Sequence, residues 1–385
     1  MAVGTDAVVW HLSDLACLRA AARGGDVNEL AHLLARRIMT TGPVTVADYM
    51  ATALGHPELG YYTTRDPLGR AGDFITAPEI SQIFGELIGL WCVTVWQQIG
   101  SPTKFNLVEL GPGRGTLIVD ALRAAMQVPA FLDGAELVLV ETSRVLRVSQ
   151  AERLAAYDPV WCDSLDGVPD GPILAIANEF FDALPVHQFV RTPRGWRERL
   201  IVWDEAELKF TVSATATPHE ALLAPEVRET APVGAVAEVQ PQSLAIAAAL
   251  GDRIETAGGA ALIVDYGHRE SVPGDSLQAV CEHEPADVLD GPGEADLTVH
   301  VDFAALRRAV GDRASVWGPV AQGPFLERLG IALRAEVLKK EATLAQAADI
   351  ASGVERLIAP NKMGSLFKVL SLTQAGLSQP PGFEE

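Results

Sequence analysis

The sequence predicts an α/β fold in which a mostly parallel sheet is covered by helices on both faces. Short apolar segments rich in Val, Ile and Leu alternate with segments of helix-forming composition through the middle of the chain. Most of these apolar segments end at a glycine or an acidic residue. Because strands that alternate with helices usually pair in parallel and are buried on both faces, this pattern predicts an open α/β sheet.

Composition limits the partners of the chain. Its 385 residues are 48% hydrophobic and only 21% charged, and 50 acidic against 30 basic residues give a net charge of −20. Nucleic acid is therefore not expected as a partner, since phosphate binding favours a basic surface. The uncharged stretch 87–103 contains two glutamines and is too polar to insert into a membrane. The first forty residues mix acids with arginines, unlike a secretory or transit peptide, so a cytoplasmic location is predicted.

Neither cysteines nor histidines show the spacing of a metal site. No C-x-x-C or H-x-x-x-H pattern occurs, so no metal is predicted and the cysteines are expected to be free thiols. The cysteines are Cys17, Cys92, Cys162 and Cys281, and the histidines considered are His187, His268, His283 and His300.

Three regions are expected along the chain. Residues 1–70 form an N-terminal helical extension, with helices predicted over 27–39 and 45–50. Residues 71–385 form the core, beginning with a glycine-containing loop at 69–76 and a long helix from Pro78 to Trp91. Within the core, residues 186–239 show period-2 alternation and polar turns, which predicts an inserted antiparallel β segment that serves as a lid or substrate platform. Core strands are expected at 107–110, 136–141, 159–163, 173–177 and 260–267, with an edge pair at 315–320 and 365–372.

The stretch 104–115, KFNLVELGPGRG, predicts a cofactor site. Its apolar residues indicate a buried strand, and helix-forming residues follow from Thr116. Between them lie Gly111, Pro112, Gly113 and Gly115. Glycines let the backbone approach a ligand, and the free N–H groups of the following helix point toward it.

The spacing of these glycines favours S-adenosylmethionine as the cofactor. A dinucleotide fingerprint has the pattern G-x-G-x-x-G, whereas this loop reads G-x-G-x-G, and no Lys-Ser/Thr pair of a P-loop follows. Glu109 ends the strand, and an acid there suits a ligand with an ammonium group better than one with a pyrophosphate. An ordinary strand-to-helix turn with accidental glycines is the alternative.

Polar residues at the next two strand ends are candidates for holding the nucleoside. Glu141 can accept hydrogen bonds from both ribose hydroxyls, and Asp163 with Ser164 can hydrogen-bond the adenine amino group. The carboxyl ends of parallel strands meet at one edge of a sheet, where ligands of open α/β sheets bind. A solvated acid at a strand end is the alternative for Glu141.

The residues after the fourth strand are candidates for the chemistry. Asn178, Glu179 and Asp182 follow this strand, and two carboxylates can hold a guanidinium by charge-assisted hydrogen bonds. Glu179 and Asp182 are three residues apart, so on a first helical turn both would point into one cleft. Alternatively, Asn178 and Asp182 only cap a helix that leads to Pro185.

Six sequence blocks resemble the MidA-like family. They are GDFITAPEISQIFGELIG from Gly72, VELGPGRGTL from Val108, ANEFFDALPVHQF from Ala177, ALIVDYG from Ala261, GEADLTVHVDF from Gly293 and MGSLFKVL from Met363. The resemblance covers roughly residues 40–375. It implies a class I, Rossmann-like S-adenosylmethionine-dependent methyltransferase with a seven-stranded sheet. It also assigns the glycines of the loop, Glu109 and Glu141 to the cofactor.

Mitochondrial members of that family are protein arginine methyltransferases that support respiratory complex I assembly. The resemblance therefore implies methylation of an arginine in a protein substrate, with a complex I subunit as one candidate. Three alternatives stay open: a methyltransferase acting on another nucleophile, a non-catalytic assembly factor that binds S-adenosylmethionine, and a Rossmann oxidoreductase.

Overall fold

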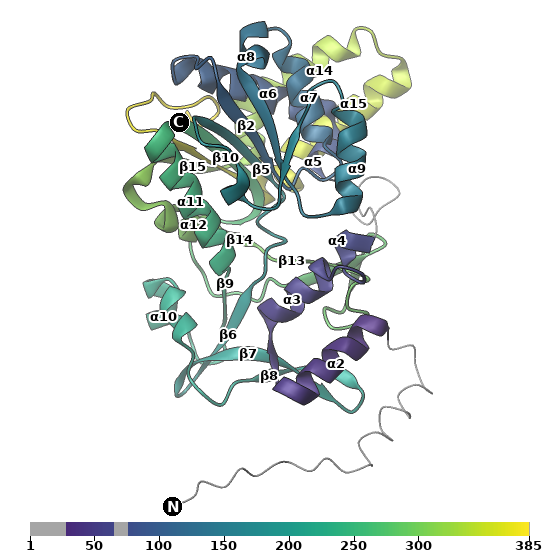
Figure 1. The fold of residues 1–385 in the computed structure, drawn as a ribbon, viewed down its shortest axis with the longest axis vertical. Helices are drawn as coiled ribbons and strands as arrows, with labels where there is room; N and C mark the ends of the chain where they lie inside the picture. Colours follow the sequence, from purple (N-terminus) through teal and green to yellow (C-terminus); the bar gives the residue numbers. More distant parts are fainter. Residues whose placement is uncertain (1–27, 65–75, 385) are drawn as a thin grey trace, which may run out of the picture.

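A mixed sheet forms the centre of the larger lobe in the computed structural model, which describes residues 28–64 and 76–384 (Figure 1). Its strands follow the order β15-β16-β10-β5-β2-β3-β4, and β14 pairs with β10 at one end. The five strands from β10 to β4 run parallel, whereas β16 runs antiparallel to both β10 and β15. The predicted α/β fold and the predicted pair at the sheet edge are confirmed. The strands are β2 (Phe105–Leu110), β3 (Ala135–Val140), β4 (Val160–Cys162), β5 (Ile173–Asn178), β10 (Gly259–His268), β14 (Val301–Asp302), β15 (Ser315–Ala321) and β16 (Phe367–Thr373).

Two apolar cores cover the two faces of this sheet. Alternate residues of each strand point to opposite faces, so Leu107 packs with α6 and α7 whereas its neighbour Val108 packs with α11 and α12. Burial on both faces explains the nearly continuous apolar runs in the strands. The helices of this lobe are α5 (Ala77–Ile80), α6 (Gln82–Gln98), α7 (Thr116–Ala125), α8 (Pro129–Gly134), α9 (Arg144–Arg153), η1 (Leu165–Gly167), α11 (Pro241–Ala257), α12 (Phe303–Val310), η3 (Gly311–Arg313), α13 (Gln322–Arg328), α14 (Ile331–Lys339), α15 (Leu344–Ile358) and α16 (Met363–Leu366).

The prediction of one continuous helix from Pro78 to Trp91 is wrong, because the helix is interrupted at Ser81. Ser81 is extended, with φ −157° and ψ 128°, and its hydroxyl accepts a hydrogen bond from the Ile83 amide to cap α6. The break separates α5 from α6. Close packing of α6 on α7 then requires glycines: a Cβ at Gly89 would lie 2.4 Å from the carbonyl oxygen of Ala121.

The smaller lobe combines segments that lie far apart in the sequence (Figure 1). Its five-stranded sheet has the order β1-β7-β6-β9, with β8 beside β7, so the segment before residue 64 shares a sheet with residues 187–239. A common core joins both segments to the three-stranded sheet β12-β11-β13. The elements are α2 (Glu29–Thr41), β1 (Val44–Thr45), α3 (Val46–Gly55), α4 (Tyr61–Thr64), β6 (His187–Thr192), β7 (Gly195–Asp204), β8 (Glu207–Val212), η2 (Pro218–Leu222), α10 (Pro225–Thr230), β9 (Val236–Val239), β11 (Gln278–Cys281), β12 (Glu284–Ala286) and β13 (Asp296–Thr298).

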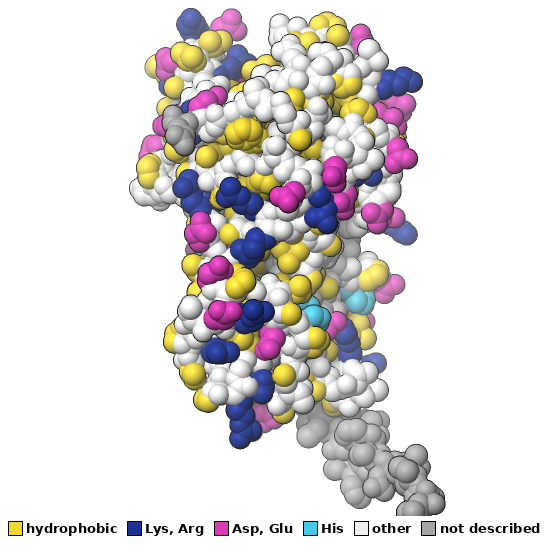
Figure 2. Space-filling model, turned by 90° about the vertical axis from the view of Figure 1, so that its left-hand side faces the viewer, with side chains coloured by type: hydrophobic (Ala, Val, Ile, Leu, Met, Phe, Trp, Pro, Cys, Tyr) yellow, Lys and Arg dark blue, Asp and Glu magenta, His cyan; other side chains and the backbone are white. Residues whose placement is uncertain are grey.

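Several predictions concern parts of the chain outside the described residues. Cys17, most of the loop at 69–76 and the start of the N-terminal extension belong to these parts. Of the predicted free thiols, Cys92 and Cys162 are confirmed. In the described ranges, no helix combines the length and the apolar character that a membrane crossing requires. Basic and acidic side chains are interspersed on the face drawn in Figure 2.

Candidate functional site

A cavity of about 780 Å³ lies between the two lobes, at the carboxyl ends of β2, β3 and β5. Its wall on the side of the large sheet consists of the loop 111–114, residues 141–144 and residues 178–185. Tyr62 of α4 and Asp296 of β13 contribute to the opposite wall. A cavity of this size at the strand ends of an α/β sheet suits a small-molecule ligand.

The glycine loop turns tightly between β2 and α7. Gly111, Gly113 and Gly115 have φ values of 62°, 53° and 76°, in the left-handed region that favours glycine. A Cβ at Gly111 would lie 2.7 Å from the Phe180 ring, so a side chain there would collide with the opposite wall. Gly115 is the N-cap of α7, which directs the free N–H groups of that helix toward the loop.

Glu109 and Glu141 lie at the floor of the cavity and are 3% and 8% exposed. Burial raises the pKa of Glu109 to about 8, and the negative charge of Glu141 adds to the shift. One carboxylate oxygen of Glu109, Oε2, has no hydrogen-bond partner among the described residues. A ligand that brings an N–H or O–H donor would satisfy this oxygen, because buried polar atoms are normally hydrogen-bonded.

Gln150 connects Glu141 to the glycine loop. Its Nε2 donates to the Gly113 carbonyl oxygen at 2.7 Å and to Glu141 Oε2 at 3.3 Å. Glu141 Oε1 also accepts from the Ser143 amide at 2.7 Å, and the Ser143 hydroxyl caps α9 by accepting from the Leu146 amide. Burial raises the pKa of Glu141, although these hydrogen bonds oppose the shift. The sequence analysis did not identify Gln150, since a lone glutamine inside a helix carries no motif.

Asp163 and Ser164 do not line this cavity. The Asp163 side chain is 85% exposed and pairs with Arg147 at 2.6 Å. The structure therefore brings the loop glycines, Glu109 and Glu141 together, while Asp163 lies at the rim of the sheet. Its predicted contact with adenine stays a prediction.

The segment after β5 is a turn, so both helix predictions for it are wrong. Neither a helical turn carrying Glu179 and Asp182 nor a helix capped by Asn178 follows β5. Instead, Asp265 Oδ2 accepts from the amides of Phe180, Phe181 and Asp182 at 3.0–3.2 Å. These bonds bend the chain around a fully buried carboxylate of β10, and Glu179 takes a left-handed conformation with φ 49°.

The turn still brings Asn178, Glu179 and Asp182 to the same cavity. Glu179 Oε1 accepts from the Ala77 amide at 2.8 Å and from Asn178 Nδ2 at 3.2 Å. Burial raises the pKa of Glu179 to about 7, and the charge of Asp182 adds to the shift. Burial likewise raises the pKa of Asp182 to about 6, against the effect of a hydrogen bond from Tyr266.

Two of these side chains hold buried oxygens without partners in the described part of the chain. They are Oδ1 of Asn178 and Oδ1 of Asp182. On the opposite wall the Tyr62 hydroxyl donates to Asp296 at 2.8 Å, so a further acid faces the cavity. The sequence analysis missed Tyr62, Tyr266 and Asp296, although Asp296 and Tyr266 lie within the quoted family blocks.

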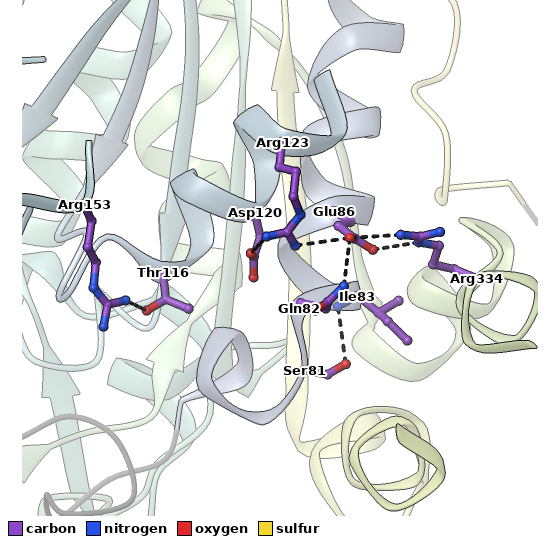
Figure 3. Close-up of polar contacts among 9 residues, drawn as sticks. All are labelled: Ser81, Gln82, Ile83, Glu86, Thr116, Asp120, Arg123, Arg153 and Arg334. Atoms are coloured by element: carbon purple, nitrogen blue, oxygen red, sulfur yellow. Dashed lines mark hydrogen bonds and ion pairs between the residues drawn. The ribbon is translucent and has the colours of Figure 1, made fainter. Parts of the chain in front are cut away.

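A second row of polar contacts fixes the helix that begins at the glycine loop (Figure 3). Arg153 donates to the Thr116 hydroxyl at 2.8 Å, and Thr116 in turn donates to Glu79 of α5. Further along α6, the buried Glu86 accepts from Arg123 of α7 and from Arg334 of α14. Burial opposes ionisation of Glu86, yet these hydrogen bonds lower its pKa overall. The network ties α5, α6 and α14 to α7, whose first turn borders the cavity.

Fold and site together define an α/β protein that binds a nucleotide-type cofactor beside an acidic pocket. The model of a family of S-adenosyl-L-methionine-dependent methyltransferases matches residues 87–320 of this chain. The chain belongs to that family, and S-adenosyl-L-methionine is its cofactor. The cavity fits S-adenosyl-L-methionine, because the unpartnered Oε2 of Glu109 beside the glycine loop is a buried acceptor that a cation with N–H groups can satisfy.

Named relatives agree with this assignment. The mitochondrial protein arginine methyltransferase NDUFAF7 of Homo sapiens is 41% identical over 374 residues, which cover 89% of this chain and 82% of that protein. Its counterpart in Danio rerio is 43% identical over 375 residues, covering 90% and 87%. A superfamily member from Burkholderia thailandensis, solved with bound S-adenosyl-homocysteine, matches with a TM-score of 0.78 and 27% identity over 97% of this chain and 96% of that one. The resemblance seen in the sequence blocks is thereby confirmed.

Proposed function

We propose that this methyltransferase modifies a guanidinium nitrogen of an arginine in a protein substrate. The observation that carries the proposal is a pair of acids, the half-buried Glu179 and the buried Asp182, in the same cavity as the glycine loop. Similarity to relatives named protein arginine methyltransferases supports it.

In this proposal the cavity has a cofactor half and a substrate half. The loop 111–115 with Pro112 would approach the cofactor through its backbone, Glu109 would accept from the ammonium group, and Glu141 would accept from the ribose hydroxyls. Asn178, Glu179 and Asp182 would hold the guanidinium by charge-assisted hydrogen bonds. In a desolvated pocket a carboxylate attracts a cation more strongly than in water, and a bound cation favours the ionised form of the acid.

The acids also suit the proton balance of the reaction. When bound, the cofactor supplies a methyl group on a sulfonium sulfur, and its transfer to nitrogen releases one proton from that nitrogen. Glu179 has a pKa raised to about 7, so its carboxylate can accept the proton near neutral pH. The rest of catalysis is positioning of the nitrogen against the methyl carbon.

The finer points of the fold belong to the same proposal. We assign the sheet to the class I type, with seven strands along its path. We divide the chain into an N-terminal helical extension over 1–70 and a core over 71–385, with residues 186–239 as the inserted substrate segment. Support comes from the shared sheet of β1 and β7, which joins the extension to the insert.

The identity of the substrate and the location of the protein are also part of this proposal. A respiratory complex I subunit is the substrate that the family resemblance implies. We propose a cytoplasmic location for this chain, whereas the named relatives are mitochondrial proteins.

The direct test supplies the full-length chain with S-adenosylmethionine tritiated on the methyl group and with an extract of cells that lack its gene. We expect label in protein, recovered after hydrolysis as methylarginine. A Gly111→Val chain serves as the control and should transfer much less label. Label on another amino acid or on a small molecule would identify a different nucleophile. Cofactor binding without any labelled product would instead favour a non-catalytic assembly factor.

A further inference from the structure

The β-rich insert carries a group of metal-ligating side chains away from the cofactor cavity. One ligand atom each of His187, Glu198 and His219 lies within 4.8 Å of the other two. His187 Nδ1 and Glu198 Oε1 are 2.6 Å apart. The two imidazole rings have centroids 4.7 Å apart, at an interplanar angle of 53°.

The topology of the insert creates this group from three elements. Phe189 pairs with Glu198 between β6 and β7, which places His187 diagonally across the ladder from Glu198. Diagonal neighbours in an antiparallel pair lie on the same face and within reach of long side chains. The third ligand comes from η2, whose start is fixed by Pro218 and by the Thr217 hydroxyl, which accepts from the His219 amide. The three residues are too widely spaced in sequence for a metal-binding motif.

Burial makes a cation at this place favourable. Glu198 is 8% exposed, and a carboxylate removed from water needs a positive partner. His187 hydrogen-bonds it, and His219 lies beside His187. A metal ion would bring two positive charges and would use the ring nitrogens of both histidines as neutral ligands.

The ligand set identifies the class of metal. Two imidazoles and one carboxylate are typical of zinc and other divalent transition metals, whereas calcium and magnesium prefer oxygen ligands alone. Tetrahedral zinc with bonds of roughly 2.1 Å separates its ligand atoms by about 3.4 Å. The ligand atoms of the three residues are between 2.6 Å and 4.8 Å apart, a range that includes this value. Small side-chain rotations are therefore sufficient to bring all three ligand atoms around one ion.

We propose that His187, Glu198 and His219 bind one divalent transition metal, preferably zinc, with water as the fourth ligand. The ion would attach η2 to the β6–β7 sheet and so stabilise the inserted segment. This site is independent of methyl transfer, and it can be tested on the full-length chain without S-adenosylmethionine.

The experiment is calorimetric titration of the chelator-treated chain with Zn²⁺, together with thermal unfolding with and without the metal. We expect saturable binding of about one ion per chain and a rise in melting temperature. His219→Ala should weaken this binding at least about tenfold, because it removes one of three protein ligands. Glu198→Gln should weaken zinc binding by a similar factor. Because glutamine keeps the shape of the side chain, this loss would not be explained by a folding defect.

The matched control is His283→Asn. His283 lies in an exposed turn with φ 66°, which asparagine tolerates, and its replacement should leave zinc binding unchanged. The proposal is overturned if the wild-type chain shows no saturable zinc binding. It is equally overturned if His219→Ala and Glu198→Gln bind zinc with the stoichiometry and affinity of the control.

Discussion

The cofactor half of the cavity is shaped mainly by backbone, whereas the substrate half is shaped by buried side chains from distant parts of the chain. In the first half, three left-handed glycines follow one another within five residues. In the second, the turn at 179–182 depends on Asp265, more than eighty residues further along the chain. The opposite wall adds Tyr62 and Asp296.

This difference has consequences for cofactor binding and for substrate specificity. A loop held by local conformation can bind the common parts of the cofactor in every member of a family. A pocket assembled from several segments can change its specificity when any one of them changes. The two halves should therefore respond separately to substitution, and the following predictions test this.

The largest effect is expected for Glu179→Gln. The variant is nearly isosteric and keeps an acceptor for the Ala77 amide, but it loses the charge that would hold a guanidinium. We expect the rate of methyl transfer to fall about a hundredfold or more, roughly 2.7 kcal/mol. Single-turnover methylation of the labelled substrate measures this rate. Affinity for S-adenosylmethionine should stay within about twofold, and full turnover would remove Glu179 from the substrate half.

Gly111→Val should affect the cofactor half instead. Its Cβ would lie 2.7 Å from the Phe180 ring, on a backbone with φ 62°. Calorimetric affinity for S-adenosylmethionine should fall at least about tenfold, roughly 1.4 kcal/mol. Gly376→Val is the control, because Gly376 has φ 83° and open space around its Cβ, so it carries backbone strain without a collision. Equal affinity in the two variants would contradict the assignment of the loop.

Glu141→Ala should weaken S-adenosylmethionine and S-adenosylhomocysteine by the same factor, about fivefold or roughly 1 kcal/mol. Both ligands carry the adenosine that we assign to Glu141. Asp163→Ala is the comparison: its exposed carboxylate should contribute less. If only one of the two ligands lost affinity, Glu141 would have to act near the sulfur.

The last prediction concerns the pH dependence of the free energy of unfolding. The pKa of Glu179 is raised to about 7 in the folded chain, above its ordinary value of 4.5, so the folded state binds more protons between these limits. Its contribution to stability is therefore complete below pH 4.5 and is lost as the pH rises through about 7. Denaturant unfolding across this range should show a decline in the free energy of unfolding that is smaller in Glu179→Gln, because glutamine does not titrate. An identical pH dependence in both chains would mean that Glu179 is not desolvated.

Apolar and glycine patterns in the sequence predicted the larger lobe well. The strand before the glycines corresponds to β2 (Phe105–Leu110), and the helix after them to α7 (Thr116–Ala125). Such segments are buried on both faces and end at glycines or capping residues, so their signal lies in adjacent residues. The gathering of Gly111, Glu109 and Glu141 at one edge follows from parallel pairing alone.

The substrate half was harder to predict because its causes are not local. The spacing of Glu179 and Asp182 predicts a helical turn, but the buried Asp265 carboxylate accepts from three amides and the segment forms a non-helical turn. Likewise, the helix expected from Pro78 onward breaks at Ser81, where serine caps α6. Tyr62 reaches the cavity only because α3 and α4 pack beside β13. The metal-ligating group in the insert depends on strand register in the same way.

A crystal structure of the chain with S-adenosylhomocysteine is the most direct test of the divided cavity. We predict that the ligand lies against the backbone of residues 111–115, with its ribose at Glu141 and its sulfur facing Glu179. A ligand bound elsewhere, or one whose sulfur points away from Glu179, would contradict the account.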